Sequence, residues 1–148
     1  MDPRMIKFLL KHHVLTLATV NDNEPYCCSL YYAFMDTHEM LVFMSNDETK
    51  HMTDVKHNNH VAGAIALESS VAKVQGIQFQ GMVEVLDGKL LVEAKNAYQK
   101  KFPMAKLMSG TVYGIALHKM KMTDNTLGFG KKLHWKKEDE EMAENLQL

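Results

Sequence analysis

The sequence predicts a mainly β protein of the α+β class, a small antiparallel barrel with helices packed on its outside. Runs of β-branched and apolar residues recur along most of the chain, and turn residues separate them closely enough for antiparallel pairing. The βαβ alternation that a parallel sheet requires is absent. The chain has 148 residues, the length of one domain with a sizeable core. We therefore expect a single domain over residues 1–148.

The first expected element is a short helix. Asp2 can cap it, Pro3 suits its first position, and an apolar stripe runs to about Lys11. Strands are expected at residues 14–20 and 26–34, joined by the turn residues 21–23 into a hairpin, and a third strand at residues 40–44.

The second half of the chain continues this alternation. Asn46 or Asp47 is expected to cap a helix that runs to about Lys56. Residues 61–67, rich in Ala and Gly, are expected to form a fully buried strand, whereas residues 77–85 alternate between an apolar and a polar face. A helix over residues 91–102 and a long strand over residues 112–122 complete the predicted order, followed by a turn and the segment 127–135.

Composition excludes several classes of function. The formal net charge is −1, which argues against general binding to nucleic acid or to an acidic membrane. The apolar patch at residues 8–10 is too short for a signal sequence or a membrane span, so we expect a cytoplasmic protein. Cys27 and Cys28 are adjacent, a poor arrangement for a disulfide, and are expected to be reduced packing residues on opposite sides of a strand.

Two familiar ligand motifs are not satisfied. The run Gly128-Phe-Gly130 begins like a dinucleotide-binding loop, but Leu133 stands where the third glycine is needed. The histidines at positions 51, 57 and 60 lack the spacing of a metal motif, so we expect no metal site. The methionine content is expected to reflect core packing.

The segment from residue 43 to residue 51 carries the strongest chemical signal. A strand ends at Ser45 and Asn46, and the first turn of the next helix contains Thr49, Lys50 and His51. A helix N-terminus offers unpaired N–H groups and a positive dipole end, and added hydroxyl groups and cations suit a terminal phosphate. An ordinary capped helix with an exposed lysine explains the same residues, and both interpretations stay open here.

The same segment resembles a known family. The patterns Phe43-x-Ser45-Asn46, Thr49-Lys50-His51 and Asn58-Asn59-x-Val61 resemble the strand-loop-helix-strand of the pyridoxamine 5′-phosphate oxidase-like FMN-binding split barrels. The wider chain is similar to their YhbP-like branch, notably in Gly76-Ile-Gln-Phe-x-Gly81 and in residues 123–132. The resemblance covers about residues 12–135, and a charged tail follows over residues 136–148.

This resemblance implies a fold, a cofactor and an assembly. It implies a split barrel that binds FMN as an oxidoreductase, usually as a homodimer with the cofactor site at the subunit interface, and a small-molecule substrate that the sequence does not identify. No catalytic side chain is implied, because the flavin itself performs the redox chemistry. The cofactor-binding residues implied by position are Ser29, Leu30, Tyr31, Ser45, Asn46, Thr49, Lys50, His51, Gln78 and Lys131.

The chain also departs from the oxidases of this family. They carry cations on the second strand, where this chain has residues 27–29 and 33–34 without charge, and Arg4 is the only arginine. Pyridoxamine phosphate is therefore not the expected substrate. One alternative is a non-catalytic split-barrel module that binds haem through a histidine, and another is a barrel with a purely dimeric role. A large loss of FMN affinity in Lys50→Ala would favour the flavoprotein over the last of these.

Overall fold

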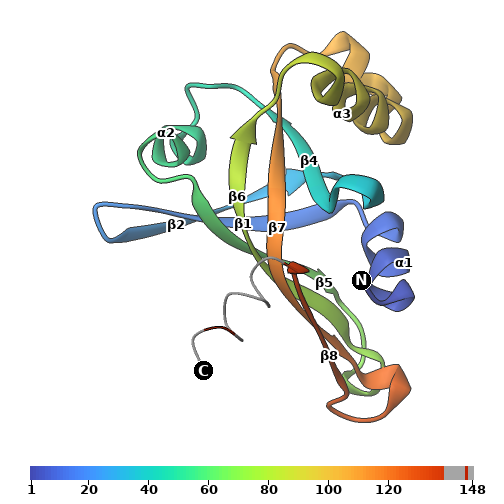
Figure 1. Cartoon of the computed structure of the whole chain (residues 1–148). Helices are drawn as coiled ribbons and strands as arrows, with labels where there is room; N and C mark the ends of the chain where they lie inside the picture. The colour runs from blue at the N-terminus through green and yellow to red at the C-terminus, as the bar shows by residue number, and fades with distance from the viewer. Residues whose placement is uncertain (139–145, 147–148) are drawn as a thin grey trace.

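The computed structural model describes residues 1–138 and 146. Its eight strands form one antiparallel sheet in the order β2-β1-β5-β6-β7-β4-β3, and β8 pairs with the part of β7 that lies beyond β4 (Figure 1). Three α-helices accompany the sheet within residues 1–138. The elements are α1 (Pro3–Lys11), β1 (Val14–Asn21), β2 (Glu24–Tyr31), β3 (Ala33–Met35), β4 (Met40–Ser45), α2 (Lys50–His57), β5 (His60–Leu67), β6 (Gln75–Val85), α3 (Gly88–Lys101), β7 (Thr111–Asp124) and β8 (Lys132–Lys136).

The opening helix forms as predicted. The Asp2 carboxylate accepts a hydrogen bond from the backbone N–H of Arg4 at 2.8 Å, and Pro3 occupies the first turn. Met5, Phe8 and Leu9 are buried on the face that packs against the sheet. The Arg4 guanidinium is bound to Asp2 through two hydrogen bonds, so the only arginine of the chain is used at this helix end.

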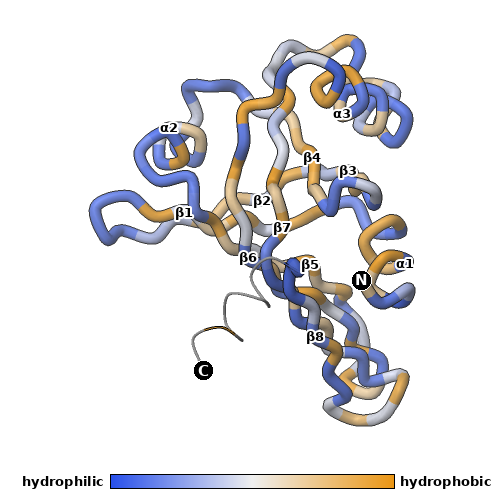
Figure 2. Tube along the Cα trace, viewed as in Figure 1, coloured by the Kyte–Doolittle hydropathy of each residue, from blue (hydrophilic) through white to orange (hydrophobic). Residues whose placement is uncertain are grey.

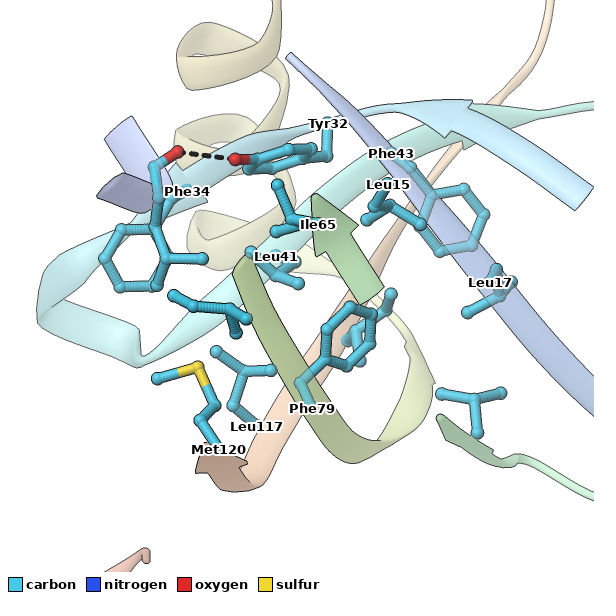
Figure 3. Packing of buried hydrophobic residues seen from close by; sticks show 14 of the residues in the cluster. Leu15, Leu17, Tyr32, Phe34, Leu41, Phe43, Ile65, Phe79, Leu117 and Met120 are labelled. Atoms are coloured by element: carbon cyan, nitrogen blue, oxygen red, sulfur yellow. Dashed lines mark hydrogen bonds between the residues drawn. The ribbon is translucent and has the colours of Figure 1, made fainter. Parts of the chain in front are cut away.

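The second predicted strand is interrupted at Tyr32. Its N–H donates to the His13 carbonyl and its buried hydroxyl donates to the Leu9 carbonyl at 2.8 Å, as the dashed line in Figure 3 marks. The chain therefore leaves β2 at Tyr31 and enters β3 at Ala33, at the opposite edge of the sheet. The expectation of one strand over residues 26–34 was wrong because a single buried tyrosine divides it in two.

The main core lies between the curved walls of the sheet. Leu15 and Leu17 of β1 meet Phe79 of β6 and the apolar residues of β4 and β7 (Figure 3). A second, smaller cluster lies under α3, where Ala94 and Tyr98 are buried, as the predicted helix over residues 91–102 requires. In Figure 2 the core strand β4 is hydrophobic, whereas the residues of the β1–β2 turn and around α2 are hydrophilic.

Strand β5 is not fully buried, contrary to the prediction. Val61 and Ile65 face the core, but Ala62 and Ala64 are half-buried and Ala66 is exposed on the other face. The small side chains leave hollow space over the outer surface of the sheet, which the next section describes.

Strands β6 and β7 form the long wall of the barrel. The alternation predicted for residues 77–85 is present, with Ile77 and Phe79 buried and Gln78 and Gln80 exposed. A bulge lies between the pairs Gln80↔Lys119 and Gly81↔Leu117.

Strand β8 was not predicted. Its Leu133 and Trp135 pack against the main core from the edge. Part of the predicted charged tail, residues 139–145 and 147–148, lies outside the described residues.

Candidate functional site at the start of helix α2

Three polar side chains converge where β4 passes into α2. Ser45 ends β4, and its Oγ lies 2.7 Å from His51 Nε2 and 3.5 Å from Thr49 Oγ1. Thr49 Oγ1 lies 3.2 Å from the same imidazole nitrogen. We call these three residues the α2 cluster. Two hydroxyl groups and an imidazole thus meet beside the first turn of a helix, where an anion also meets unpaired N–H groups and the positive dipole end.

The cap of α2 lies later than predicted. Thr49 is the N-cap, since its hydroxyl accepts from the N–H of Met52 and donates to the Asn46 carbonyl at 2.9 Å. The predicted caps have other roles. Asn46 supplies that carbonyl, and the Asp47 carboxylate accepts a hydrogen bond from the Tyr113 hydroxyl. The helix therefore starts at Lys50 and brings the side chain of His51 back over the end of β4.

His51 is almost fully buried, with 8% of its surface exposed. Burial lowers the pKa of its imidazole, against the opposing effect of the nearby Asp54 carboxylate. The imidazole is therefore neutral at pH 7 and serves as a hydrogen-bonding group rather than as a cation.

Lys50 is paired with a carboxylate that sequence reasoning missed. Its Nζ bonds to Asp54, which has no exposed surface, and the other Asp54 oxygen accepts from Thr19 Oγ1 at 2.8 Å. The bond from Lys50 holds the pKa of Asp54 below its usual value, against burial. The Lys50 ammonium also lies 5.4 Å from the ring centroid of Tyr26. The i,i+4 spacing of Lys50 and Asp54 was the sequence signal for this pair.

The predicted β2 residues divide between the two faces of the strand. Leu30 packs against the main core, as does Cys28, whose burial raises the pKa of its thiol to about 11. Ser29, Tyr31 and Cys27 are exposed. The two cysteines occupy opposite sides of the strand as expected, but only Cys28 is a packing residue, and that expectation was wrong for Cys27 because its side chain lies on the uncovered face.

Gln78 shares the outer face with Ser29. The pairing register aligns one residue from each of six strands into a row that runs from β2 to β8. A second row lies beside it, and all members of the two rows except Ser29 line a groove formed by two cavities of about 690 and 610 Å³. The first row is Ser29, Thr16, Ala64, Gln78, Lys121 and His134; the second is Cys27, Ala18, Ala62, Gln80, Lys119 and Lys136.

The groove has two chemically different sides. Small side chains of β1 and β5 form one side, and amide, ammonium and imidazole groups of β6, β7 and β8 form the other. The bulge contributes to the polar side, because His118 is the extra β7 residue between the buried Leu117 and Lys119, and it lines the groove together with Lys119. Sequence reasoning missed this residue, since a bulge leaves no periodic signal.

Lys131 lies far from the α2 cluster within the same chain. It belongs to the connection between β7 and β8, where its N–H donates to the Gly128 carbonyl and its carbonyl accepts from the N–H of Asp124. Figure 1 places this connection at the end of the molecule opposite α2. The structure thus brings Ser45, Asn46, Thr49, Lys50 and His51 together, sets Ser29, Tyr31 and Gln78 on the outer face, and leaves Lys131 apart.

Comparisons with known proteins show which family the chain resembles. The family described as "Pyridoxamine 5′-phosphate oxidase" matches residues 1–122. A UPF0306 protein of Yersinia pestis is 38% identical over 130 residues, which cover 87% of this chain and 88% of that protein.

Solved structures share the split-barrel fold. A haem-binding protein from Mycobacterium smegmatis superposes with a TM-score of 0.72 at 20% identity over 84% of this chain, which spans about half (52%) of that protein. A FAD-binding protein from Mesorhizobium loti superposes with a TM-score of 0.68 at 17% identity, over 82% of this chain and 94% of that protein. At these identities the likeness establishes the fold. Among the described residues, no helix has the length and apolar composition needed to cross a membrane.

Proposed function

The chain belongs to the pyridoxamine 5′-phosphate oxidase family, and from this premise we propose that it is an FMN-binding flavoprotein with oxidoreductase activity. The observation that carries the proposal is the α2 cluster, in which Ser45, Thr49 and His51 converge beside a helix N-terminus. When bound, FMN would transfer hydride at its ring, while the protein would position that ring against the substrate and exclude water from it.

The donor set of the α2 cluster fits a terminal phosphate. The Ser45 hydroxyl and the backbone N–H groups of the first turn can donate to phosphate oxygens, Thr49 holds the loop through its bond to the Asn46 carbonyl, and the helix dipole favours the negative charge. Lys50 adds an ammonium group in the first turn, and half of its side-chain surface is exposed. We therefore assign the FMN phosphate to Ser45, Asn46, Thr49, Lys50 and His51.

We assign the flavin ring to the interface of a homodimer. Ser29 and Tyr31, which flank Leu30 on β2, and the amide of Gln78 belong to the same sheet face, whose small residues allow a planar ring to approach closely. A second subunit would cover this face, and Lys131 would approach the phosphate only from that partner. The substrate in this proposal is a small molecule. The protein offers it no arginine to bind a phosphate group, since its only arginine, Arg4, is engaged by Asp2.

The proposal is tested by spectroscopy and by one hydroxyl deletion. Purified protein titrated with FMN should quench flavin fluorescence and gain thermal stability. Ser45→Ala should weaken FMN binding about tenfold, the loss of one charge-assisted hydrogen bond, and leave riboflavin binding unchanged. Thr53→Val removes an exposed hydroxyl from the same helix and is the matched control. No FMN binding by the native chain would refute the proposal.

A second candidate function is haem binding without catalysis. The observation that favours it is the bulge, which places His118 in the lining of the cavity that His60 and Lys119 also line. An imidazole there can ligate the haem iron, and the ammonium group can pair with a haem propionate. Haemin titration should then give a Soret band that His118→Ala removes. His134→Ala, in the neighbouring cavity, is the control. A flavin spectrum without haem uptake would exclude this candidate.

A further inference from the structure

The ammonium group of Lys50 is already engaged by a carboxylate inside the protein. Asp54 lies one helical turn beyond Lys50, whereas Ser45 and Thr49 precede the helix. The Asp54 carboxylate bonds to Lys50 through one oxygen and to the Thr19 hydroxyl through the other. It has no surface in contact with solvent, so water cannot replace the ammonium if it leaves.

The three side chains of the α2 cluster carry no formal charge themselves. Ser45 and Thr49 present hydroxyl groups, and buried His51 presents a neutral imidazole. At pH 8, where His51 is neutral, a phosphate dianion at the α2 cluster therefore depends on Lys50 for its countercharge. That countercharge is fully available only if Lys50 is withdrawn from Asp54.

We propose that Asp54 is an internal competitor for Lys50 that weakens the binding of a phosphorylated ligand at the α2 cluster, so that the ligand exchanges readily instead of remaining as a permanent prosthetic group. The inference rests on the proposed function, because it concerns the phosphate site assigned there. Asp54 is a positioning residue in this scheme, since it acts on the ligand through Lys50. Its role is to set how much of the ammonium's charge the phosphate receives.

The substitution Asp54→Asn removes the competing charge and keeps an oxygen that can accept from Thr19. FMN should then bind about tenfold or more tightly than to the native chain, because Lys50 turns to the phosphate without leaving a buried carboxylate unpaired. Riboflavin, which lacks the phosphate, should bind native and variant chains equally. Asp54→Ser, a second neutral variant, should show the same pattern, and thermal melts should establish that each variant is folded.

A double-mutant cycle separates competition from simple repulsion between Asp54 and the phosphate. In the Lys50→Met background, Asp54→Asn should change FMN affinity by no more than about threefold, because there is no ammonium left to release. An equal gain with and without Lys50 would overturn the proposal, as would an unchanged or lower FMN affinity in folded Asp54→Asn. Failure of all chains to bind FMN would refute the proposed function as well, whereas native binding without the Asp54→Asn gain refutes this inference alone.

Discussion

Gly63, in the middle of β5, occupies a position where even one added methyl group meets fixed atoms. It pairs with Leu17 of β1 on one side and with Phe79 of β6 on the other. A Cβ atom at this position would lie 2.2 Å from Cζ of Phe79 and 2.4 Å from the carbonyl oxygen of Thr16. Carbon atoms in contact normally lie about 3.5–4.0 Å apart, so the overlap exceeds about 1 Å.

Neither neighbour can move aside at low cost. Phe79 is 2% exposed within the main core, and the Thr16 oxygen belongs to the backbone of the paired strand β1. Overpacking of a dense core costs about 1–3 kcal/mol, and a clash with both a buried ring and a backbone atom belongs at the upper limit. We therefore expect Gly63→Ala to lower the free energy of unfolding by about 3 kcal/mol.

Thermal unfolding measures this loss directly. For a chain of this size, about 3 kcal/mol corresponds to a fall in Tm of about 6–12 °C. Gly76→Ala is the control on the neighbouring strand β6, because its added Cβ would approach no atom closer than 3.3 Å. We expect that variant to unfold within about 1 kcal/mol of the native chain. Equal Tm values for the two variants would refute the reasoning from close approach at Gly63.

Three further predictions concern single side chains. Between pH 8 and 6.5, FMN binding should tighten as the pH falls. Burial lowers the pKa of His51, whereas a bound phosphate raises it and so favours the uptake of a proton by the imidazole. Riboflavin binding should show no such trend, and a pH-independent FMN affinity would contradict the prediction. Tyr32→Phe should cost about 1–2 kcal/mol in urea denaturation, because the buried Leu9 carbonyl loses its donor; an unchanged midpoint would contradict it. At pH 8, a maleimide should label exposed Cys27 much faster than Cys28, whose thiol pKa is raised to about 11, as peptide mapping would measure; equal rates would refute this.

Much of the fold is predictable from the sequence because its signals are local. The Asp2 cap, the turn after β1 and the alternation in β6 each depend on a few adjacent residues, and each is present in the structure. The exceptions depend on distant contacts. Tyr32 divides a strand because of its bond to Leu9, and β5 is half exposed because the sheet leaves its outer side uncovered.

The candidate site is predictable in residue identity but not in charge. Position along the chain was sufficient to select Ser45, Thr49 and His51, which the structure brings within hydrogen-bonding distance. The electrostatics of the same segment depend on Asp54 and on burial. Sequence reasoning counted Lys50 as a countercharge, and a carboxylate one turn away engages it.

Tyr32 also determines how the barrel can open. Strands β2 and β3 are the two ends of the strand order, and this one residue joins them covalently. The β1–β2 hairpin consequently cannot peel away from the sheet without pulling on β3 and on α1, to which the Tyr32 hydroxyl is bound. Fraying that starts at either edge is transmitted to the other. The two edges should therefore exchange their amide hydrogens as one cooperative unit, although nearly the whole sheet lies between them.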